Sequence, residues 1–178
     1  MRNAVVLTAL LVLPVNTAHA QDINIPREIE RLADKAVNTV NVTIEGALLR
    51  LAGTVLSSAD PEQRVAKNLI SGLKGIYVRS FEFAGPGQYS VSDVESLRSQ
   101  MKVPAWSRVA GVRNTRDGED VDVFLKMEKD RITGVVVIAA QARQLTVVNI
   151  VGPIDLEQLA SLGGQFGIPK IEVERPRK

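Results

Sequence analysis

Four consecutive β-forming segments, joined only by short turns, constrain the fold of this chain more than any other feature. They read "WSRVAGVR", "VDVFLKM", "ITGVVVIAA" and "QLTVVNIV", and they lie between Trp106 and Val151. The turns between them include Asp117-Gly118, a strong hairpin signal, and "EKDR". Strands joined by turns this short pair in antiparallel fashion. The sequence therefore predicts an antiparallel meander, whose nearly all-apolar third segment is typical of a central strand.

Helical patterns precede this meander. Apolar residues recur at helical spacing from Ile25 to Val37, and a second, largely apolar helix runs from Leu48 to Leu56. A third helix has Asp60 as its N-cap and Gln63 as the partner in a capping box, and Gly72 or Gly75 ends it. Between the first two helices, alternating Val40, Val42 and Ile44 predict an extended segment or a short edge strand.

Two further helices and one strand complete the prediction. The segment "GIYVRSFEF" is rich in β-formers and predicts a strand, and Ser92 with Glu95 forms a second capping box that opens a helix through Met101. A last helix begins at Asp155. We therefore expect an α+β fold in which helices pack on a single twisted, mainly antiparallel sheet of about five strands.

The N-terminus has the three parts of a secretory signal in order. Arg2 supplies the positive charge, Ala4 to Val15 is apolar, and Ala18-His19-Ala20 is a small-residue cleavage site. We expect residues 1–20 to be removed after Ala20, leaving 21–178 as a single domain in the periplasm or the medium. The apolar run is too short to span a membrane, so the cleaved product should not be membrane-spanning.

Cleavage would also remove the only histidine, His19, and the chain has no cysteine. The remaining residues then exclude Ser-His-Asp and Cys-His catalysis, the common zinc sites, iron–sulfur clusters and haem attachment. Disulfides and a lipidated N-terminal cysteine are excluded as well. We expect no cofactor, no metal and no catalytic residue.

The charge pattern argues against nucleic acid as a partner. The formal net charge is only +2, the basic residues are dispersed apart from the tail "ERPRK", and aromatic residues make up 4%. Nucleic-acid-binding domains usually present a clustered basic face.

Two short motifs resemble functional sites but have simpler interpretations. Gly163, Gly164 and Gly167 follow the last predicted helix, where glycine ends helices, whereas a phosphate-binding loop precedes its helix. Ser71 and Lys74 match S-x-x-K, but the partner motifs S-D-N and K-T-G are missing from the sequence. We interpret the first as helix punctuation and the second as the last turn of a helix.

Charged and aromatic residues of the strands supply the remaining candidates. Arg79, Arg108 and Arg113 form a candidate anion or partner patch, although arginines on strands usually pair with cross-strand carboxylates. The carboxylates around the predicted hairpin lack a calcium-loop pattern and are interpreted as its solvated face; they are Glu119, Asp120, Asp122, Glu128 and Asp130. The aromatic residues Tyr77, Phe81, Phe83 and Trp106 are more typical of a core than of a groove.

Several blocks together resemble a known family. They are "GLKGIYVRSFEF", "WSRVAGVR", "VDVFLKMEKDRITGVVVIAA" and "LTVVNIVGPIDLEQLASLGGQFGIPK". They are similar to the bacterial family catalogued as domain of unknown function 4252. The resemblance implies a small envelope protein with a secretion signal, and it supplies no catalytic residues.

We therefore expect an exported, non-enzymatic domain that binds an envelope protein or ligand. Two alternatives remain open: a small hydrolase or lyase using Ser-Lys or paired carboxylates, and a carrier of an apolar ligand. An enzyme should bring ionisable groups with shifted pKa values into one pocket, whereas a binding domain should expose an apolar patch or a sheet edge.

Overall fold

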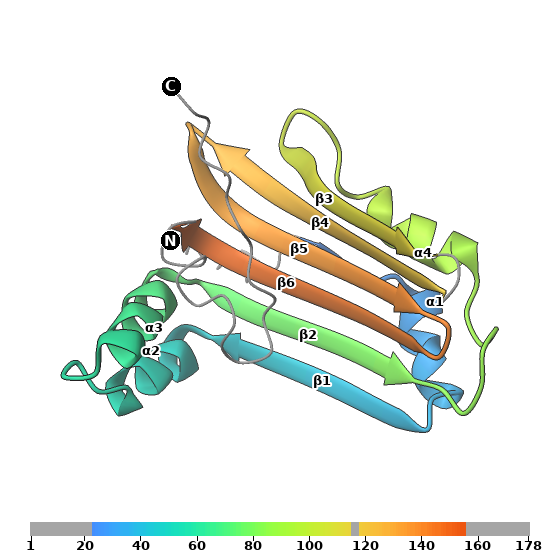
Figure 1. The fold of residues 1–178 in the computed structure, drawn as a ribbon, viewed down its shortest axis with the longest axis horizontal. Helices are drawn as coiled ribbons and strands as arrows, with labels where there is room; N and C mark the ends of the chain where they lie inside the picture. The colour runs from blue at the N-terminus through green and yellow to red at the C-terminus, as the bar shows by residue number, and fades with distance from the viewer. Residues whose placement is uncertain (1–22, 115–117, 156–178) are drawn as a thin grey trace, which may run out of the picture.

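The fold is one antiparallel sheet with helices on both of its faces (Figure 1). A computed structural model of the chain describes residues 23–114 and 118–155. The strands are β1 (Asn38–Glu45), β2 (Gly75–Glu82), β3 (Trp106–Asn114), β4 (Glu119–Glu128), β5 (Arg131–Gln141) and β6 (Gln144–Ile154). The helices are α1 (Arg27–Glu30), the 3₁₀ helix η1 (Arg31–Asp34), α2 (Gly46–Val55), α3 (Pro61–Gly72) and α4 (Val91–Arg98).

The α+β class and the antiparallel sheet are confirmed, but the strand number is six in the described residues rather than about five. The additional member is β1, because the alternating segment around Val42 forms a full edge strand of eight residues. The order across the sheet is β1-β2-β6-β5-β4-β3. The predicted meander β3-β4-β5-β6 is therefore confirmed, and the β1–β2 pair joins it through antiparallel pairing of β2 with β6.

Tight turns close the meander. Lys129 and Asp130 connect β4 to β5 and have φ values of 49° and 63°, as a two-residue hairpin turn requires. Gly118 has φ of 65° at the start of β4, in agreement with the predicted Asp-Gly turn, although Asp117 lies outside the described residues. Extra residues interrupt the register at Val109 in β3, opposite β4, and at Thr133 in β5, opposite Lys126 and Met127 of β4. Such bulges increase the twist of a sheet.

Two predicted helix boundaries are wrong. The first helix does not continue to Val37; it passes into η1, and the amide of Val37 donates a hydrogen bond to the Glu82 carbonyl, which aligns β1 with β2. In α4 the capping box is formed by Ser90 and Asp93 rather than by Ser92 and Glu95. The Asp60 cap is confirmed, because its carboxylate accepts the Gln63 amide at 3.3 Å, and α3 ends at Gly72 as predicted.

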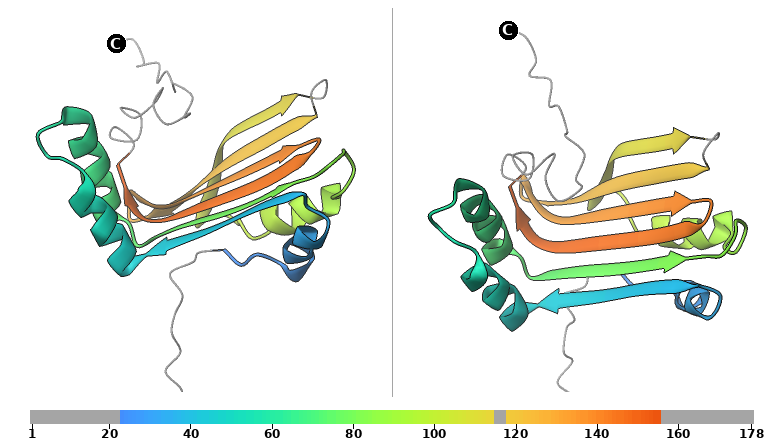
Figure 2. Two further views of the ribbon diagram at one scale, coloured as in Figure 1. Left: turned by 90° about the horizontal axis from the view of Figure 1, so that it is seen from below. Right: turned by 60° about the horizontal axis from the view of Figure 1, so that its bottom comes forward.

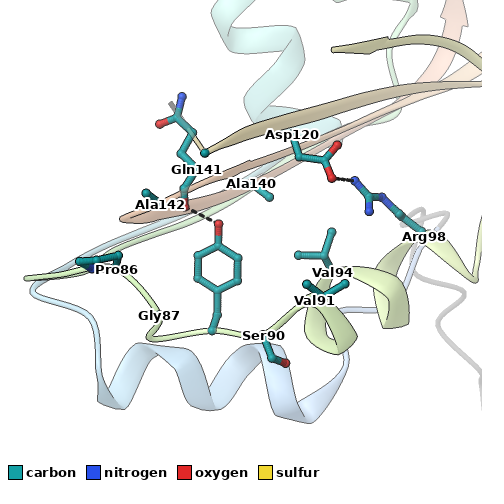
Figure 3. Close-up of a pocket in the computed structure, with 12 residues that line it drawn as sticks. Pro86, Gly87, Ser90, Val91, Val94, Arg98, Asp120, Ala140, Gln141 and Ala142 are labelled. Carbon is teal, nitrogen blue, oxygen red and sulfur yellow. Dashed lines mark hydrogen bonds and ion pairs between the residues drawn. The ribbon is translucent and has the colours of Figure 1, made fainter. Parts of the chain in front are cut away.

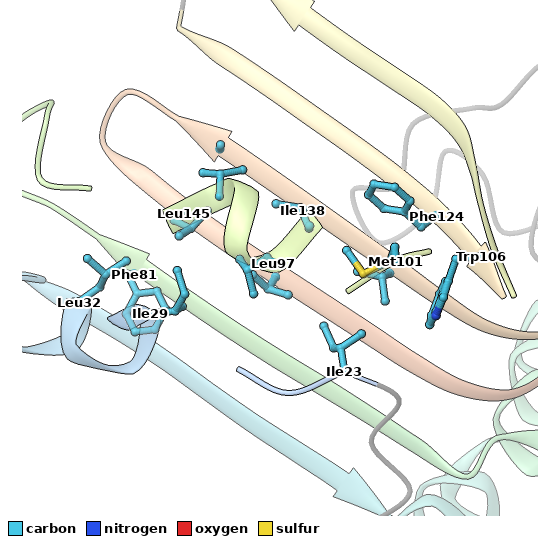
Figure 4. Packing of buried hydrophobic residues seen from close by; sticks show 14 of the residues in the cluster. Ile23, Ile29, Leu32, Phe81, Leu97, Met101, Trp106, Phe124, Ile138 and Leu145 are labelled. Atoms are coloured by element: carbon cyan, nitrogen blue, oxygen red, sulfur yellow. The ribbon is translucent and has the colours of Figure 1, made fainter. Parts of the chain in front are cut away.

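The main core lies between the sheet and the helices α1, η1 and α4 (Figure 4). Ile29 and Leu32 from the first helices and Leu97 from α4 pack onto Phe81, Ile138 and Leu145 of the strands. The predicted aromatic residues are buried: Tyr77 is 4% exposed, Phe81 2%, Phe83 0% and Trp106 6%. Their assignment to the interior rather than to a groove is confirmed.

The helices α2 and α3 stand at the opposite end of the strands and rise on the other face of the sheet (Figure 2). The end of α3 approaches β6 closely at Gly152, whose φ is 134°. A Cβ atom there would lie 2.8 Å from Leu73 Cα, and the Lys74 amide donates to the Val151 carbonyl at 2.7 Å. Glycine is therefore required where α3 meets the sheet.

Candidate functional site

The two faces of the sheet differ sharply in how well they are covered. Successive residues of a strand point to opposite faces. Along β6, residues from Gln144 to Val151 alternate between half-buried and buried, and β5 shows nearly the same alternation. The buried set faces α1, η1 and α4, whereas the half-buried set faces the other way. Within the described residues, helices α1, η1 and α4 therefore close one face, and the half-buried side chains lie on the other.

We call this second surface the open face. It is largely apolar, because strand alternation places valine, isoleucine and leucine side chains on it. Ser80 and Thr146, which contact each other, are polar members of the same face. The register of the six strands puts the following half-buried residues on this face: Val42, Ile44, Ile76, Val78, Val121, Val123, Leu125, Val137, Ala139, Val148 and Ile150. An antiparallel sheet with one solvated face normally presents polar side chains there, so this apolar face is unusual.

One end of the open face is covered by α3. Leu69 and Leu73 pack against a second cluster built on Ile132, Val135 and Ile154. A groove of about 570 Å³ runs beside α3, between the β4–β5 hairpin and the last described residues, Pro153 to Asp155. In the part of the chain that the structure describes, this packed cluster ends at the groove.

A charged corner lies on the closed face, at the β3–β4 edge of the sheet. Asp122 is 1% exposed, yet it is ionisable, and two arginines contact it. Arg98, in the last turn of α4, approaches one carboxylate oxygen at 2.5 Å, and Arg108 of β3 bonds to the other. Buried carboxylates persist when they are paired in this way.

Asp120 extends this corner toward solvent. Its carboxylate lies 2.9 Å from Arg98 and 3.2 Å from Arg113, its direct partner across β3 and β4. Arg98 also contacts Glu95 at 2.8 Å, one turn earlier on α4. The Arg108 side chain lies across Gly111, where a Cβ atom would be 2.0 Å from the guanidinium. Glycine at that position lets Arg108 reach Asp122.

The pKa shifts in this corner keep Asp120 and Arg98 in their charged forms. Burial alone would raise the pKa of Asp120, but the contacts and charges of Arg98 and Arg113 outweigh burial and lower it. Burial alone would lower the pKa of Arg98, but Glu95, Asp120 and Asp122 raise it. Both groups therefore stay ionised near neutral pH.

A pocket of about 250 Å³ opens beside this corner (Figure 3). Tyr89 stands in it, and its hydroxyl donates to the Gln141 carbonyl and contacts the Gln144 carbonyl at 3.2 Å. Burial and the nearby charge of Asp120 raise the pKa of Tyr89, so the phenol stays protonated. Arg98 and Asp120 line the same pocket.

The three arginines predicted as a patch do not all meet. Arg108 and Arg113 lie together on β3 and pair with Asp122 and Asp120, which confirms the expected cross-strand pairing. Arg79 lies on β2, three strands away from β4 in the sheet order, and donates to the backbone carbonyls of Val42 and Val78. The described contacts thus bring Arg108 and Arg113 together and leave Arg79 with other partners.

The interpretation of the hairpin carboxylates as a solvated face is wrong for Asp122. The sequence "EDVDVFL" places Asp120 and Asp122 two residues apart, so both point to the closed face, where α4 supplies Arg98. Within 23–114 and 118–155, no group of three or more potential ligand side chains is arranged to hold a metal ion.

The other sequence motifs contribute little here. Ser71 is exposed, and its hydroxyl donates to the Asn68 carbonyl within α3 at 2.8 Å, as expected for a residue in a last helical turn. The predicted cleavage site at Ala20 and the glycines Gly163, Gly164 and Gly167 lie outside the described residues. In the part of the chain that the structure describes, no helix is both long and apolar enough to cross a membrane.

Sequence reasoning missed the roles of Arg98 and Tyr89. Arg98 follows Glu95 at the i+3 spacing of a helical ion pair, but nothing local indicates its contacts across the sheet. The sequence of each strand shows alternating apolar residues, but only the strand order shows that these residues form one surface.

Comparison with known proteins identifies the family but no activity. No curated protein and no solved structure matches the chain. A family model described as Domain of unknown function (DUF4252) matches residues 34–162, which include the described residues from α3 to β6 and continue beyond Asp155. The chain therefore belongs to the DUF4252 family, as its sequence blocks predicted.

Proposed function

We propose that this chain is an exported, non-enzymatic binding domain that contacts a protein partner through the open face. The observation that carries the proposal is the largely apolar, partly exposed surface that runs from β1 to β4. Soluble monomers rarely expose a contiguous apolar surface larger than a few hundred Å², and larger ones mark interaction sites. Export would follow from the leader Met1 to Ala20.

The charged corner supports binding or structure better than acid–base chemistry. A general acid or base works best when its pKa lies near the working pH. The pKa values of Arg98 and Tyr89 are raised and that of Asp120 is lowered, so each shift moves the group away from neutrality. These groups hold α4 and the Tyr89 loop against the sheet.

The open face also indicates what the partner presents. Its side chains are short and branched, so they form a shallow surface of valines and isoleucines rather than a deep cavity. A partner that lays an amphipathic helix on this surface would bury both apolar faces at once.

A photo-crosslinking experiment tests this function. A photoreactive residue placed at Val112 probes the edge of the open face, because this side chain is 55% exposed and is therefore replaceable. Val91, 77% exposed at the start of α4, is the matched control on the closed side. We expect one protein to be crosslinked from Val112 and not from Val91.

The purified partner then provides the quantitative test. Val137→Thr keeps the shape of this open-face side chain and replaces one methyl group with a hydroxyl, so we expect an affinity lower by about tenfold with little change in fold. Equal crosslinking from both positions, or an unchanged affinity, would contradict the proposal. Turnover of an ester panel that Lys74→Ala abolishes would favour the hydrolase alternative, and saturable fatty-acid binding would favour the carrier.

A further inference from the structure

The geometry points to an occupant for part of the open face within the chain itself: we propose that the segment from Leu156 to Ile168 packs on it beside α3. A partner would then have to displace this segment or share the face with it. The displacement by a partner rests on the proposed function, whereas the packing of the segment on the open face does not.

The point where the described chain ends supports this proposal. Ile154 is 9% exposed and belongs to the cluster on the open face, together with Ile132. Pro153, Ile154 and Asp155 form one wall of the groove of about 570 Å³ beside α3. The described chain therefore ends at the rim of the open face.

The sequence after Asp155 complements that surface. Asp155 and Gln158 have the spacing of an N-cap and its partner, and the apolar residues that follow recur at helical spacing. The apolar residues are Leu156, Leu159, Ala160 and Leu162, followed by Phe166 and Ile168. A helix with this stripe would bury it against another apolar surface, and the open face begins where the described chain ends.

The size of the segment fits partial cover. A helix with its side chains is about 10 Å wide and neighbouring strands lie about 4.8 Å apart, so one helix covers about two strands. Placed next to its exit, it would cover β5 and β6 and leave the outer strands accessible. The family match extends to residue 162, so the family's domain includes the first apolar turns of this segment.

The absence of cysteine from the sequence provides a clean test. Val137→Cys places one thiol on the open face, and Val91→Cys places one on the closed side as the control. We would measure the rate of maleimide labelling of each, in residues 21–178 with the natural segment and with Leu159→Asp plus Leu162→Asp. Circular dichroism would verify that all four proteins fold.

If the segment covers the face, the two aspartates speed labelling at Val137→Cys by about tenfold and leave Val91→Cys unchanged. An unchanged rate at Val137→Cys would overturn the proposal. A rate that falls as protein concentration rises would assign the cover to a second copy and would overturn it as well.

The same proteins separate this inference from the proposed function. The partner recovered by crosslinking should slow labelling of Val137→Cys in the aspartate variant. Slowing by the partner without any effect of the aspartates would refute the internal cover and retain the binding function. Faster labelling in the aspartate variant without slowing by the partner would support the internal cover and refute the binding function.

Discussion

Replacing Asp122 with asparagine tests whether the charged corner holds α4 to the sheet. The Asp122 side chain is 2% exposed, and Arg98, at 14%, would lose a partner that water cannot replace. Removing one member of a buried ion pair typically costs about 3–5 kcal/mol. Arg98 keeps Glu95 and Asp120, and Arg108 is 52% exposed and can be hydrated. We therefore expect Asp122→Asn to lower the free energy of unfolding by about 3 kcal/mol, the lower end of that range.

Urea unfolding followed by circular dichroism and by the fluorescence of Trp106 would measure this loss. Arg113→Gln is the matched control, because its side chain is 65% exposed and its ion pair should contribute at most about 1 kcal/mol. If Asp122→Asn costs no more than Arg113→Gln, the reasoning about a buried, paired carboxylate fails.

Three further predictions concern single positions. Gly152→Ala should destabilise the protein by about 3 kcal/mol through backbone strain and a clash with α3, while Gly85→Ala, where a Cβ meets nothing within 4 Å, should melt like the parent. Because the pKa of Asp120 is lowered in the folded state, its stabilising contribution is present above its unfolded pKa of about 3.9 and is lost as pH falls through the folded value. The urea midpoint should therefore fall more steeply below pH 4 in the parent than in Asp120→Asn, and parallel curves would contradict this. Tyr89→Phe should cost about 1 kcal/mol in thermal unfolding, since it removes the hydrogen bond to Gln141 and keeps the ring; an unchanged melting temperature would argue against that bond.

Local patterns predicted the strands and turns well, because these depend on neighbouring residues. The alternation in β4 and the turn at Lys129 and Asp130 are examples. The pairing of β2 with β6 could not be predicted, since alternation defines a strand without naming its partner. The first helix was predicted too long because its amphipathic pattern cannot reveal that Val37 bonds to Glu82 instead.

Of the candidate site, the sequence predicted only ion pairs between neighbouring strands. Arg113 opposite Asp120 follows from a hairpin register, and so this pair was foreseeable. The burial of Asp122 depends on α4 crossing the strands and bringing Arg98, a contact between residues 24 positions apart. Likewise, half-exposed valines become a continuous open face only after the strands are ordered.

The seam between β2 and β6 has a consequence for the order in which the molecule is made. Ser80 and Thr146 contact each other at 2.7 Å although 66 positions separate them, and β6 is the last strand of the described residues. The edge of β2 that pairs with β6 therefore stays unpaired until β6 has been synthesised. The entropy of closing the long loop between β2 and β6 is lost before the contacts between these strands form. Folding should therefore be slow compared with that of a helical bundle. A chain whose described sheet is completed only by β6 therefore stays without its full set of strand pairs for most of its synthesis.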